Sequence, residues 1–250
     1  MTWSLEQARE KLILALDFPS ASLCIEFLDR LHGDVGDELR LRWVKVGLQL
    51  FLAEGPAFVA RLQGDGYQVF LDLKLHDIPN TVAGAVRAVL PLAPALLTVH
   101  ASGGPAMLAA AAEAAAGAST QLLAVTVLTS VDAEQLRAVG VDGSPAAQVE
   151  RLAQLTEASG IDGLVCSPQE AARLRTLLPK AHLVTPGIRT GGVENRPGQA
   201  HSDDQQRTGS AGGALRAGAS QLVIGRPIAA AADPARAYLT FLAEIAGAQT

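Results

Sequence analysis

Residues 71–81 read LDLKLHDIPNT and place two carboxylates around a lysine where an apolar strand gives way to a helix. The residues before them are typical of a strand, so Asp72 and Lys74 are expected on one face at its carboxyl end. Active sites of α/β folds lie at that edge. Since buried charges need partners, we expect these two residues and Asp77 to form a network suited to proton chemistry. The alternative is a solvated strand end with simple salt bridges, in which the residues from Asp77 onward cap the next helix.

The length and composition of the chain suit a compact enzyme with a small ligand. Its 250 residues match the size of a (β/α)8 barrel, although two smaller domains would also fit. Apolar residues make up 49% and charged residues 18% of the sequence, which suits parallel strands buried on both faces. The net charge of -5 gives no general attraction for nucleic acid or an anionic membrane, so we expect neither as a partner. Any phosphate must be bound by a local site.

Short apolar runs alternate along the chain with stretches rich in Ala, Leu, Glu and Arg. The runs are typical of buried strands, and the stretches between them are typical of surface helices. Repetition of this unit to the end of the chain favours a single-domain (β/α)8 TIM barrel over residues 1–250, with an open doubly wound sheet as the alternative. The expected strands are Leu12–Leu16, Trp43–Val46, Val69–Leu73, Leu96–Val99, Leu122–Val127, Gly163–Cys166, Leu183–Thr185 and Gln221–Ile224, and the expected helices include Ala21–Leu31, Val82–Leu90, Pro105–Ala116 and Pro168–Leu177.

Residues 190–213 interrupt this pattern with a segment crowded with Gly, Pro, Ser, Asn, Asp and Gln. The segment is too polar for a core and predicts a long loop after the seventh strand. Long loops inside compact domains are usually lids or disordered inserts. Its place beside the expected phosphate site favours a mobile loop that closes over the phosphate.

The cysteines and the amino terminus carry no metal or targeting signal. Cys24 and Cys166 lie far apart and lack the spacing of a metal or redox site, so we expect reduced thiols in the core. The first residues lack a basic segment followed by an apolar run, and no apolar stretch long enough to span a membrane follows. We therefore expect a cytoplasmic protein.

Polar side chains close the expected strands and, in a barrel, would share one rim. Each has a simpler explanation alone, for example Asp17 as a helix cap or His100 as a hydrogen-bonded core residue. Lys45 is harder to explain, because it ends a buried strand and needs an anionic partner, for which Asp72 is the candidate. The functional signal is the convergence of the whole set: Asp17, Lys45, Asp72, Lys74, His100, Thr129, Ser167, Arg189 and Arg226.

Two segments near the carboxyl end predict a phosphate site. Gly225-Arg226-Pro227 brings a glycine, backbone N–H groups and a guanidinium to the loop after the last strand, and residues 185–189 (TPGIR) supply the other half. Barrels commonly bind phosphate in the loops after their seventh and eighth strands. Arginine suits this task because its planar fork can donate two hydrogen bonds to one phosphate. The alternative is that Arg226 only pairs with a neighbouring carboxylate.

Taken together, these segments resemble the orotidine 5'-phosphate decarboxylase family across essentially the whole chain. Related barrels that act on sugar phosphates share the Asp-x-Lys-x-x-Asp core of residues 72–77, but a metal-binding acid typically stands in them where this chain has Lys45. Lys45 therefore favours the nucleotide enzyme. The resemblance rests on Leu14-Ala15-Leu16-Asp17, Lys45-Val46-Gly47, residues 71–81, Thr98-Val99-His100-Ala101, Val127-Leu128-Thr129-Ser130, Thr185-Pro186-Gly187-Ile188-Arg189, Asp203-Asp204-Gln205 and Val223-Ile224-Gly225-Arg226-Pro227-Ile228.

The resemblance implies conversion of orotidine 5'-monophosphate to uridine 5'-monophosphate and carbon dioxide, the last step of de novo pyrimidine synthesis, without metal or organic cofactor. Loss of carbon dioxide leaves a poorly delocalised carbanion that the site must stabilise and protonate. The implied catalytic residues are Lys45, Asp72, Lys74 and Asp77. In this interpretation Lys74 stabilises and then protonates the carbanion, Asp72 lies beside the departing carboxylate, and Lys45 holds Asp72 and the ribose.

The resemblance also implies a homodimer, because Asp77 and Thr81 in this family reach into the partner's site. The loop of residues 190–213, whose first part has little fixed pattern to align, would close over the phosphate. The remaining substrate contacts implied are Asp17 to the ribose, Thr129 to the pyrimidine edge, and Gln205, Gly225 and Arg226 to the phosphate, with Arg189 and Pro186 nearby.

Two other functions stay open. One is a related sugar-phosphate lyase or aldolase that needs magnesium. The other is a barrel that binds nucleotide phosphate without turnover, as a sensor or scaffold. Such a barrel would need Gly225 and Arg226 but not four charged residues at the end of one strand pair.

Overall fold

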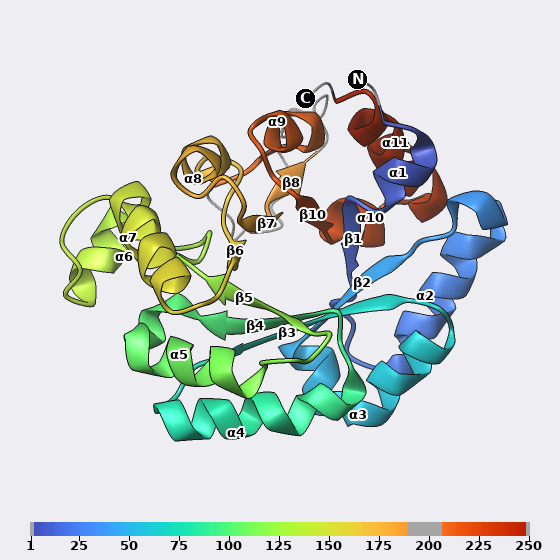
Figure 1. Ribbon diagram of the computed structural model, residues 1–250. Coiled ribbons are helices and arrows are strands. Elements are labelled where there is room, and N and C mark those ends of the chain that lie inside the picture. The colour runs from blue at the N-terminus through green and yellow to red at the C-terminus, as the bar shows by residue number, and fades with distance from the viewer. Residues whose placement is uncertain (1–2, 190–206, 249–250) are drawn as a thin grey trace.

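Parallel strands close into a barrel in the computed structural model, which describes residues 3–189 and 207–248 (Figure 1). The order around the barrel is β1-β10-β7-β6-β5-β4-β3-β2, so each strand lies beside its neighbour in the chain. This closure confirms the predicted (β/α)8 fold and excludes the open sheet. The barrel strands are β1 (Leu12–Ala15), β2 (Trp43–Gly47), β3 (Gln68–Leu75), β4 (Leu96–His100), β5 (Gln121–Val125), β6 (Gly163–Val165), β7 (His182–Thr185) and β10 (Gln221–Ile224).

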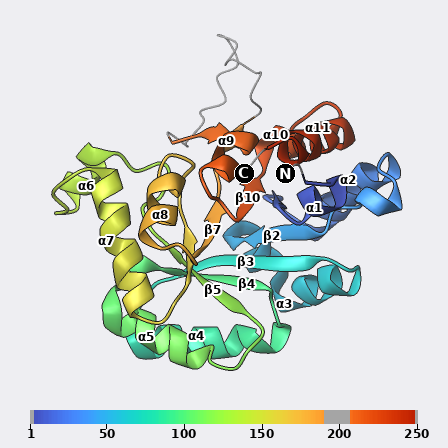
Figure 2. The same ribbon diagram turned by 45° about the horizontal axis from the view of Figure 1, so that its top comes forward.

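Helices surround the barrel as an outer layer. Both views place α4 beside α5 on one side, and they bring the two ends of the chain together where α1 packs against α11 (Figures 1 and 2). The helices are α1 (Leu5–Arg9), α2 (Ala21–Gly33), α3 (Leu48–Gly64), α4 (Pro79–Val89), α5 (Gly104–Ala114), α6 (Ala133–Ala138), α7 (Pro145–Ala158), α8 (Ala171–Leu177), α9 (Ala211–Arg216), α10 (Arg226–Ala229) and α11 (Pro234–Ala246), with 3-10 turns at Asp37–Leu39, Leu90–Leu92 and Ala101–Gly103.

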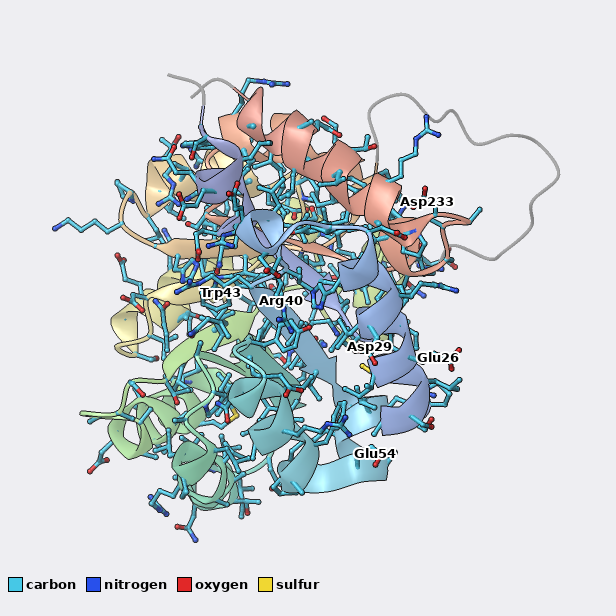
Figure 3. The ribbon with its side chains drawn as sticks, turned by 90° about the vertical axis from the view of Figure 1, so that its right-hand side faces the viewer. Glu26, Asp29, Arg40, Trp43, Glu54 and Asp233 are labelled. Atoms are coloured by element: carbon cyan, nitrogen blue, oxygen red, sulfur yellow. The ribbon has the colours of Figure 1, made fainter. Side chains whose placement is uncertain are left out.

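Helix α2 illustrates how the outer layer forms. Its N-cap is Ser20, whose hydroxyl accepts a hydrogen bond from the backbone N–H of Leu23, so Asp17 is not the cap. Glu26 and Asp29 are exposed on this helix, which faces the viewer in Figure 3. The opposite face is apolar and packs on the barrel through Cys24, Phe27, Leu28 and Leu31.

Two apolar clusters hold the barrel together. The larger lies between the strands and the helices, as expected for strands that are buried on both faces. The smaller fills the inside of the barrel with side chains from β1, β3, β4, β5, β7 and β10, so the interior is a packed core. Its buried members are Ile13, Ala15, Phe70, Leu96, Leu123, Val184 and Val223.

The predicted loop at residues 190–213 ends earlier than expected. Gly209–Ser210 forms the short strand β9, which pairs with β8 (Ile188–Arg189), and Ser210 then caps α9. The expectation of loop up to Gly213 is therefore wrong, because strand pairing and a cap order this small polar stretch. Residues 190–206 lie outside the described part of the chain.

Within residues 3–189 and 207–248, no helix is both long enough and apolar enough to cross a membrane.

Candidate active site

Four charged side chains of alternating sign form a row at the carboxyl ends of β1, β2 and β3. The Nζ atom of Lys45 lies 3.2 Å from Asp17 Oδ1 and 3.5 Å from Asp72 Oδ2. The Nζ atom of Lys74 donates a 2.7 Å hydrogen bond to the same Asp72 Oδ2. Asp72 is therefore shared by two ammonium groups, as the sequence predicted for Lys45 and Lys74.

Burial and neighbouring charges shift the pKa values of Asp72 and Lys45, the two innermost groups of the row, in opposite directions. Burial disfavours the charged form of Asp72, but the nearby Lys45 and Lys74, with hydrogen bonds from Lys74 and Thr98, lower its pKa below the ordinary value. Burial likewise disfavours the Lys45 ammonium, yet Asp72 and Asp17 raise its pKa. Both groups therefore stay charged at neutral pH while only 7% of Asp72 is exposed.

The backbone bends where these residues lie. The regular pairing of β3 with β4 joins Leu71 to Leu97 and then Leu75 to Val99, so β3 contains a bulge between the two pairs. Lys74, inside this bulge, has a φ of 48°, a left-handed conformation that costs a non-glycine residue roughly 1 kcal/mol or more. Bulges beside active sites commonly re-aim a side chain. Here the bulge directs Lys74 toward Asp72.

Gly47 leaves the space that the row of charges needs. A Cβ atom at this position would lie 3.1 Å from Lys45 Nζ and 3.4 Å from Asp17 Oδ1. A side chain there would therefore press on the ion pair between those two residues.

The row forms one wall of a cavity of about 580 Å³ at this end of the barrel. Asp17, Lys45, Asp72 and Lys74 line this cavity, and so does Thr129. The predicted phosphate residues Pro186, Arg189, Gly225 and Arg226 also line the cavity, as does Gly187. The floor is apolar and includes Ala15, Phe70, Val125, Val165 and Val223.

Other predicted residues lie outside this cavity. Asp77 is exposed, and its Oδ1 accepts a 2.6 Å hydrogen bond from the N–H of Ile78, while Thr81 is also exposed. Helix α4 begins at Pro79 with no side-chain cap, so the alternative in which the residues from Asp77 to Asn80 cap this helix is wrong. Gln205 lies outside the described residues.

Two residues of the expected rim serve other contacts. His100 stacks on His76 with ring centroids 5.3 Å apart and lies 3.0 Å from the Ser102 hydroxyl. Ser167 is fully buried and donates its hydroxyl to Glu170. Neither is among the residues that line the cavity.

The cysteines are buried thiols, as predicted. Burial raises the pKa of both Cys24 and Cys166 to about 12, so neither is a thiolate at neutral pH. Within the described ranges, no group of three or more His, Cys, Asp or Glu side chains is arranged to hold a metal ion.

Two residues near the site, Thr98 and Arg207, were not predicted from the sequence. Thr98 contacts Asp72 from β4, and its signal was a polar residue inside the apolar run 96–99. Arg207 pairs with Glu170 at 3.0 Å and donates to the carbonyl oxygens of Val127 and Leu128, which adjoin Thr129. Arg207 fell inside the predicted loop, so its burial could not be foreseen.

Comparison with known proteins identifies the family. The family model described as "Orotidine 5'-phosphate decarboxylase / HUMPS family" matches residues 10–241. The orotidine 5'-phosphate decarboxylase of Halorhodospira halophila is 48% identical over 241 residues, with 95% of this chain and 97% of the relative covered. That of Chromohalobacter salexigens is 47% identical, covering 94% and 95%.

A solved structure agrees with these relatives. The crystal structure of orotidine 5'-phosphate decarboxylase from Lactobacillus acidophilus superimposes with a TM-score of 0.76 and 36% sequence identity, covering 94% of this chain and 98% of that one. The match therefore extends over the barrel and over the segments that build the cavity. The chain belongs to the orotidine 5'-phosphate decarboxylase family and, like the relatives named above, is a carboxy-lyase.

Proposed function

We propose that this carboxy-lyase converts orotidine 5'-monophosphate to uridine 5'-monophosphate and carbon dioxide, the last step of de novo pyrimidine synthesis. The observation that carries the proposal is the sharing of Asp72 Oδ2 by Lys45 and Lys74 on the wall of the cavity. A buried carboxylate held ionised beside two ammonium groups suits a reaction in which a second carboxylate leaves and negative charge develops on carbon. The shared substrate name of the relatives supports the same assignment.

The proposed chemistry breaks one carbon–carbon bond and forms one carbon–hydrogen bond. The electron pair of the broken bond stays on the ring carbon as carbon dioxide departs beside Asp72. The Lys74 ammonium stabilises this carbanion and then gives it a proton, which leaves a neutral amine for solvent to reprotonate. Lys45 holds Asp72 and the ribose in place, and no cofactor enters the scheme.

The proposed substrate contacts involve residues that line the cavity. The sugar lies against Asp17 and Lys45, the pyrimidine edge lies against Thr129, and the phosphate lies near Gly225 and Arg226. Arg189 and Pro186 lie close to the phosphate, and Gln205, which lies outside the described residues, is proposed to bind it as well. These roles follow the family resemblance, and the cavity lining supports them for every residue except Gln205.

We also propose a homodimer in which Asp77 and Thr81 enter the partner's site. Both are exposed and lie off the cavity of their own chain. Ile78, which is 66% exposed, follows β3, and the exposed Leu48 and Leu52 follow the neighbouring strand β2. The exposed apolar side chain of Ile78, which follows Asp77 in the chain, supports an interface there. The cytoplasmic location stays a prediction from sequence.

The first experiment is an absorbance assay of the purified protein with orotidine 5'-monophosphate in buffer containing a chelator. Conversion to uridine 5'-monophosphate at an enzymatic rate supports the proposal. Absence of both binding and conversion would reopen the magnesium-dependent sugar-phosphate reaction. Binding without conversion would favour a non-catalytic nucleotide-binding barrel.

A mixing experiment tests the shared sites. Lys74→Ala and Asp77→Ala homodimers are each expected to be nearly inactive, because each lacks one group in both sites. A heterodimer places both changes in one site and leaves the other intact, so an equal mixture after subunit exchange should regain about one quarter of wild-type activity. A mixture that exchanges subunits but regains none would show that Asp77 serves its own chain.

A further inference from the structure

Thr98 carries a fully buried hydroxyl in the middle of an apolar strand, and this hydroxyl contacts two residues of the charged row, Asp72 and Lys74. Its Oγ1 donates a 3.0 Å hydrogen bond to Asp72 Oδ1. The same oxygen accepts a 2.8 Å hydrogen bond from the backbone N–H of Lys74. A threonine hydroxyl has one proton to give and lone pairs to receive, so both contacts are made at once.

The place of Thr98 in the sheet explains why a side chain is needed there. Leu97 pairs with Leu71 and Val99 pairs with Leu75, so Thr98 lies opposite the bulge of β3. A bulge interrupts the ladder and leaves backbone groups without their usual partners. The Thr98 hydroxyl takes the place of the ladder acceptor for Lys74, the residue with a φ of 48°.

The contact also gives the two carboxylate oxygens of Asp72 different partners. Oδ1 is occupied by Thr98, while Oδ2 faces the ammonium groups of Lys45 and Lys74. A carboxylate held at one oxygen cannot rotate freely about its terminal torsion, so its other oxygen is fixed toward the ammonium groups.

We propose that Thr98 is a positioning residue for decarboxylation, because its hydroxyl fixes both the Asp72 carboxylate and the left-handed backbone of Lys74. The inference rests on the proposed function, since it concerns the geometry of the same site. Thr98 acts through these two residues and lies off the cavity lining. Loss of the hydroxyl misplaces the charges by a fraction of an ångström while the substrate contacts elsewhere in the cavity remain.

The test compares Thr98→Val with Thr98→Ser. Valine keeps the shape and removes the hydroxyl, whereas serine keeps the hydroxyl and removes a methyl group. For Thr98→Val we expect kcat to fall about tenfold to a hundredfold, the range for small misplacements of catalytic groups. KM and the affinity for uridine 5'-monophosphate should stay within about threefold, since ground-state contacts persist. Thr98→Ser should restore kcat to within about threefold of wild type.

Thr156→Val is the matched control. Thr156 is equally buried, lies on helix α7, and donates its hydroxyl to the carbonyl oxygen of Leu152. The same chemical change there should alter the urea midpoint but leave kcat unchanged. Thr98→Ala provides a second hydroxyl-free variant should Thr98→Val fail to fold, and the same loss of kcat is expected for it.

The outcomes separate positioning from packing and from the proposed function. Full kcat in Thr98→Val, or equal losses in Thr98→Val and Thr98→Ser, would overturn the role of the hydroxyl. A raised KM with normal kcat would also overturn it, because that pattern reports substrate binding. Absence of turnover in the wild-type protein would instead refute the proposed function, and the urea midpoints of the variants identify any that do not fold.

Discussion

The two ends of the barrel are both polar and both hollow, yet they are built differently. The carboxyl end holds charged groups around a cavity of about 580 Å³, with a left-handed lysine in a strand bulge. The amino end has a hollow of about 480 Å³ that is lined by the first residues of several strands. There the polar side chains are three amides, an imidazole, an indole, two hydroxyls and one charge of each sign, from Glu10 and Lys11.

A chain of hydrogen bonds closes the amino end. Gln121 donates to Asp162, and its Oε1 lies 2.6 Å from His182, whose other ring nitrogen lies 3.1 Å from Gln221 Oε1. Gln221 in turn donates to the carbonyl oxygen of Glu10, and Trp43, visible in Figure 3, donates to the Glu10 side chain. A polar hollow is therefore not by itself a site. At the amino end, hydrogen bonds link the first residues of regular strands. At the carboxyl end, a cluster of charged side chains and a strained backbone residue face a cavity.

The largest expected difference between the ends is the effect of removing a lysine from each. Lys74→Ala should lower kcat by about 10⁴-fold or more, because it removes both carbanion stabilisation and the proton donor. Binding of uridine 5'-monophosphate should remain detectable by calorimetry. Lys11→Ala, at the amino end, is the matched control and should leave kcat unchanged. A near-normal rate in Lys74→Ala would refute the role assigned to this residue.

The second prediction concerns the phosphate side of the cavity. Arg226→Ala should weaken binding of uridine 5'-monophosphate about tenfold to a hundredfold, since hydrogen bonds to charged groups contribute roughly 1.5–3 kcal/mol. Uridine, which lacks the phosphate, should bind wild type and variant equally. Equal loss for both ligands would mean that Arg226 shapes the cavity instead of binding phosphate.

The sequence predicted most of the fold because the strands are buried on both faces. Gln221–Ile224 matches β10 in full, and the other expected runs match their strands to within a few residues. Charge at strand ends predicted the row from Asp17 to Lys74 because polar residues in such places need partners.

The bulge could not be predicted, because spacing along a strand describes regular pleating. Asp72 and Lys74 were expected on one face of an extended strand, but they meet through a left-handed turn supported by Thr98 on the next strand. The pairing of β8 with β9 was missed for a similar reason. Composition alone makes Gly209 and Ser210 resemble a loop, and only the tertiary partner orders them.

The third prediction tests the amino end. Gln221→Leu should lower the free energy of unfolding by about 1–3 kcal/mol, because it removes the hydrogen bonds that Gln221 makes with the Glu10 carbonyl and with one ring nitrogen of His182. The rate should stay within about twofold of wild type, since chemistry belongs to the other end. Gln68→Leu is the control, because Gln68 is an exposed glutamine at the same end and its loss should change stability by less than about 0.5 kcal/mol. A large loss of kcat in Gln221→Leu, with the fold intact, would contradict this division of roles.

The smallest expected effect is a pH dependence that both ends share. Burial, and then the charges of His76 and Lys74, lower the pKa of His100 to about 4, against the opposing effect of Asp72. Burial also lowers the pKa of His182 at the amino end and of His32 on α2. Between about pH 6.5 and pH 4 the unfolded chain binds protons that the folded chain does not, so stability falls as pH falls through this window.

His100→Gln should remove the part of this loss of stability that comes from His100. Because His100 is only half-buried, we expect the share to be about 1 kcal/mol, measured as the difference between urea unfolding of the protein at pH 7 and at pH 4. Asp72 acts in a lower range, since its lowered pKa means that its contribution is lost only below its ordinary value of 3.8. His182→Gln should likewise remove part of the stability loss between pH 7 and pH 4 without changing kcat. The two variants therefore compare a histidine at the amino end with one at the carboxyl end. Parallel stability curves for wild type and His100→Gln would mean that His100 titrates normally, and that burial near Lys74 does not keep its ring uncharged.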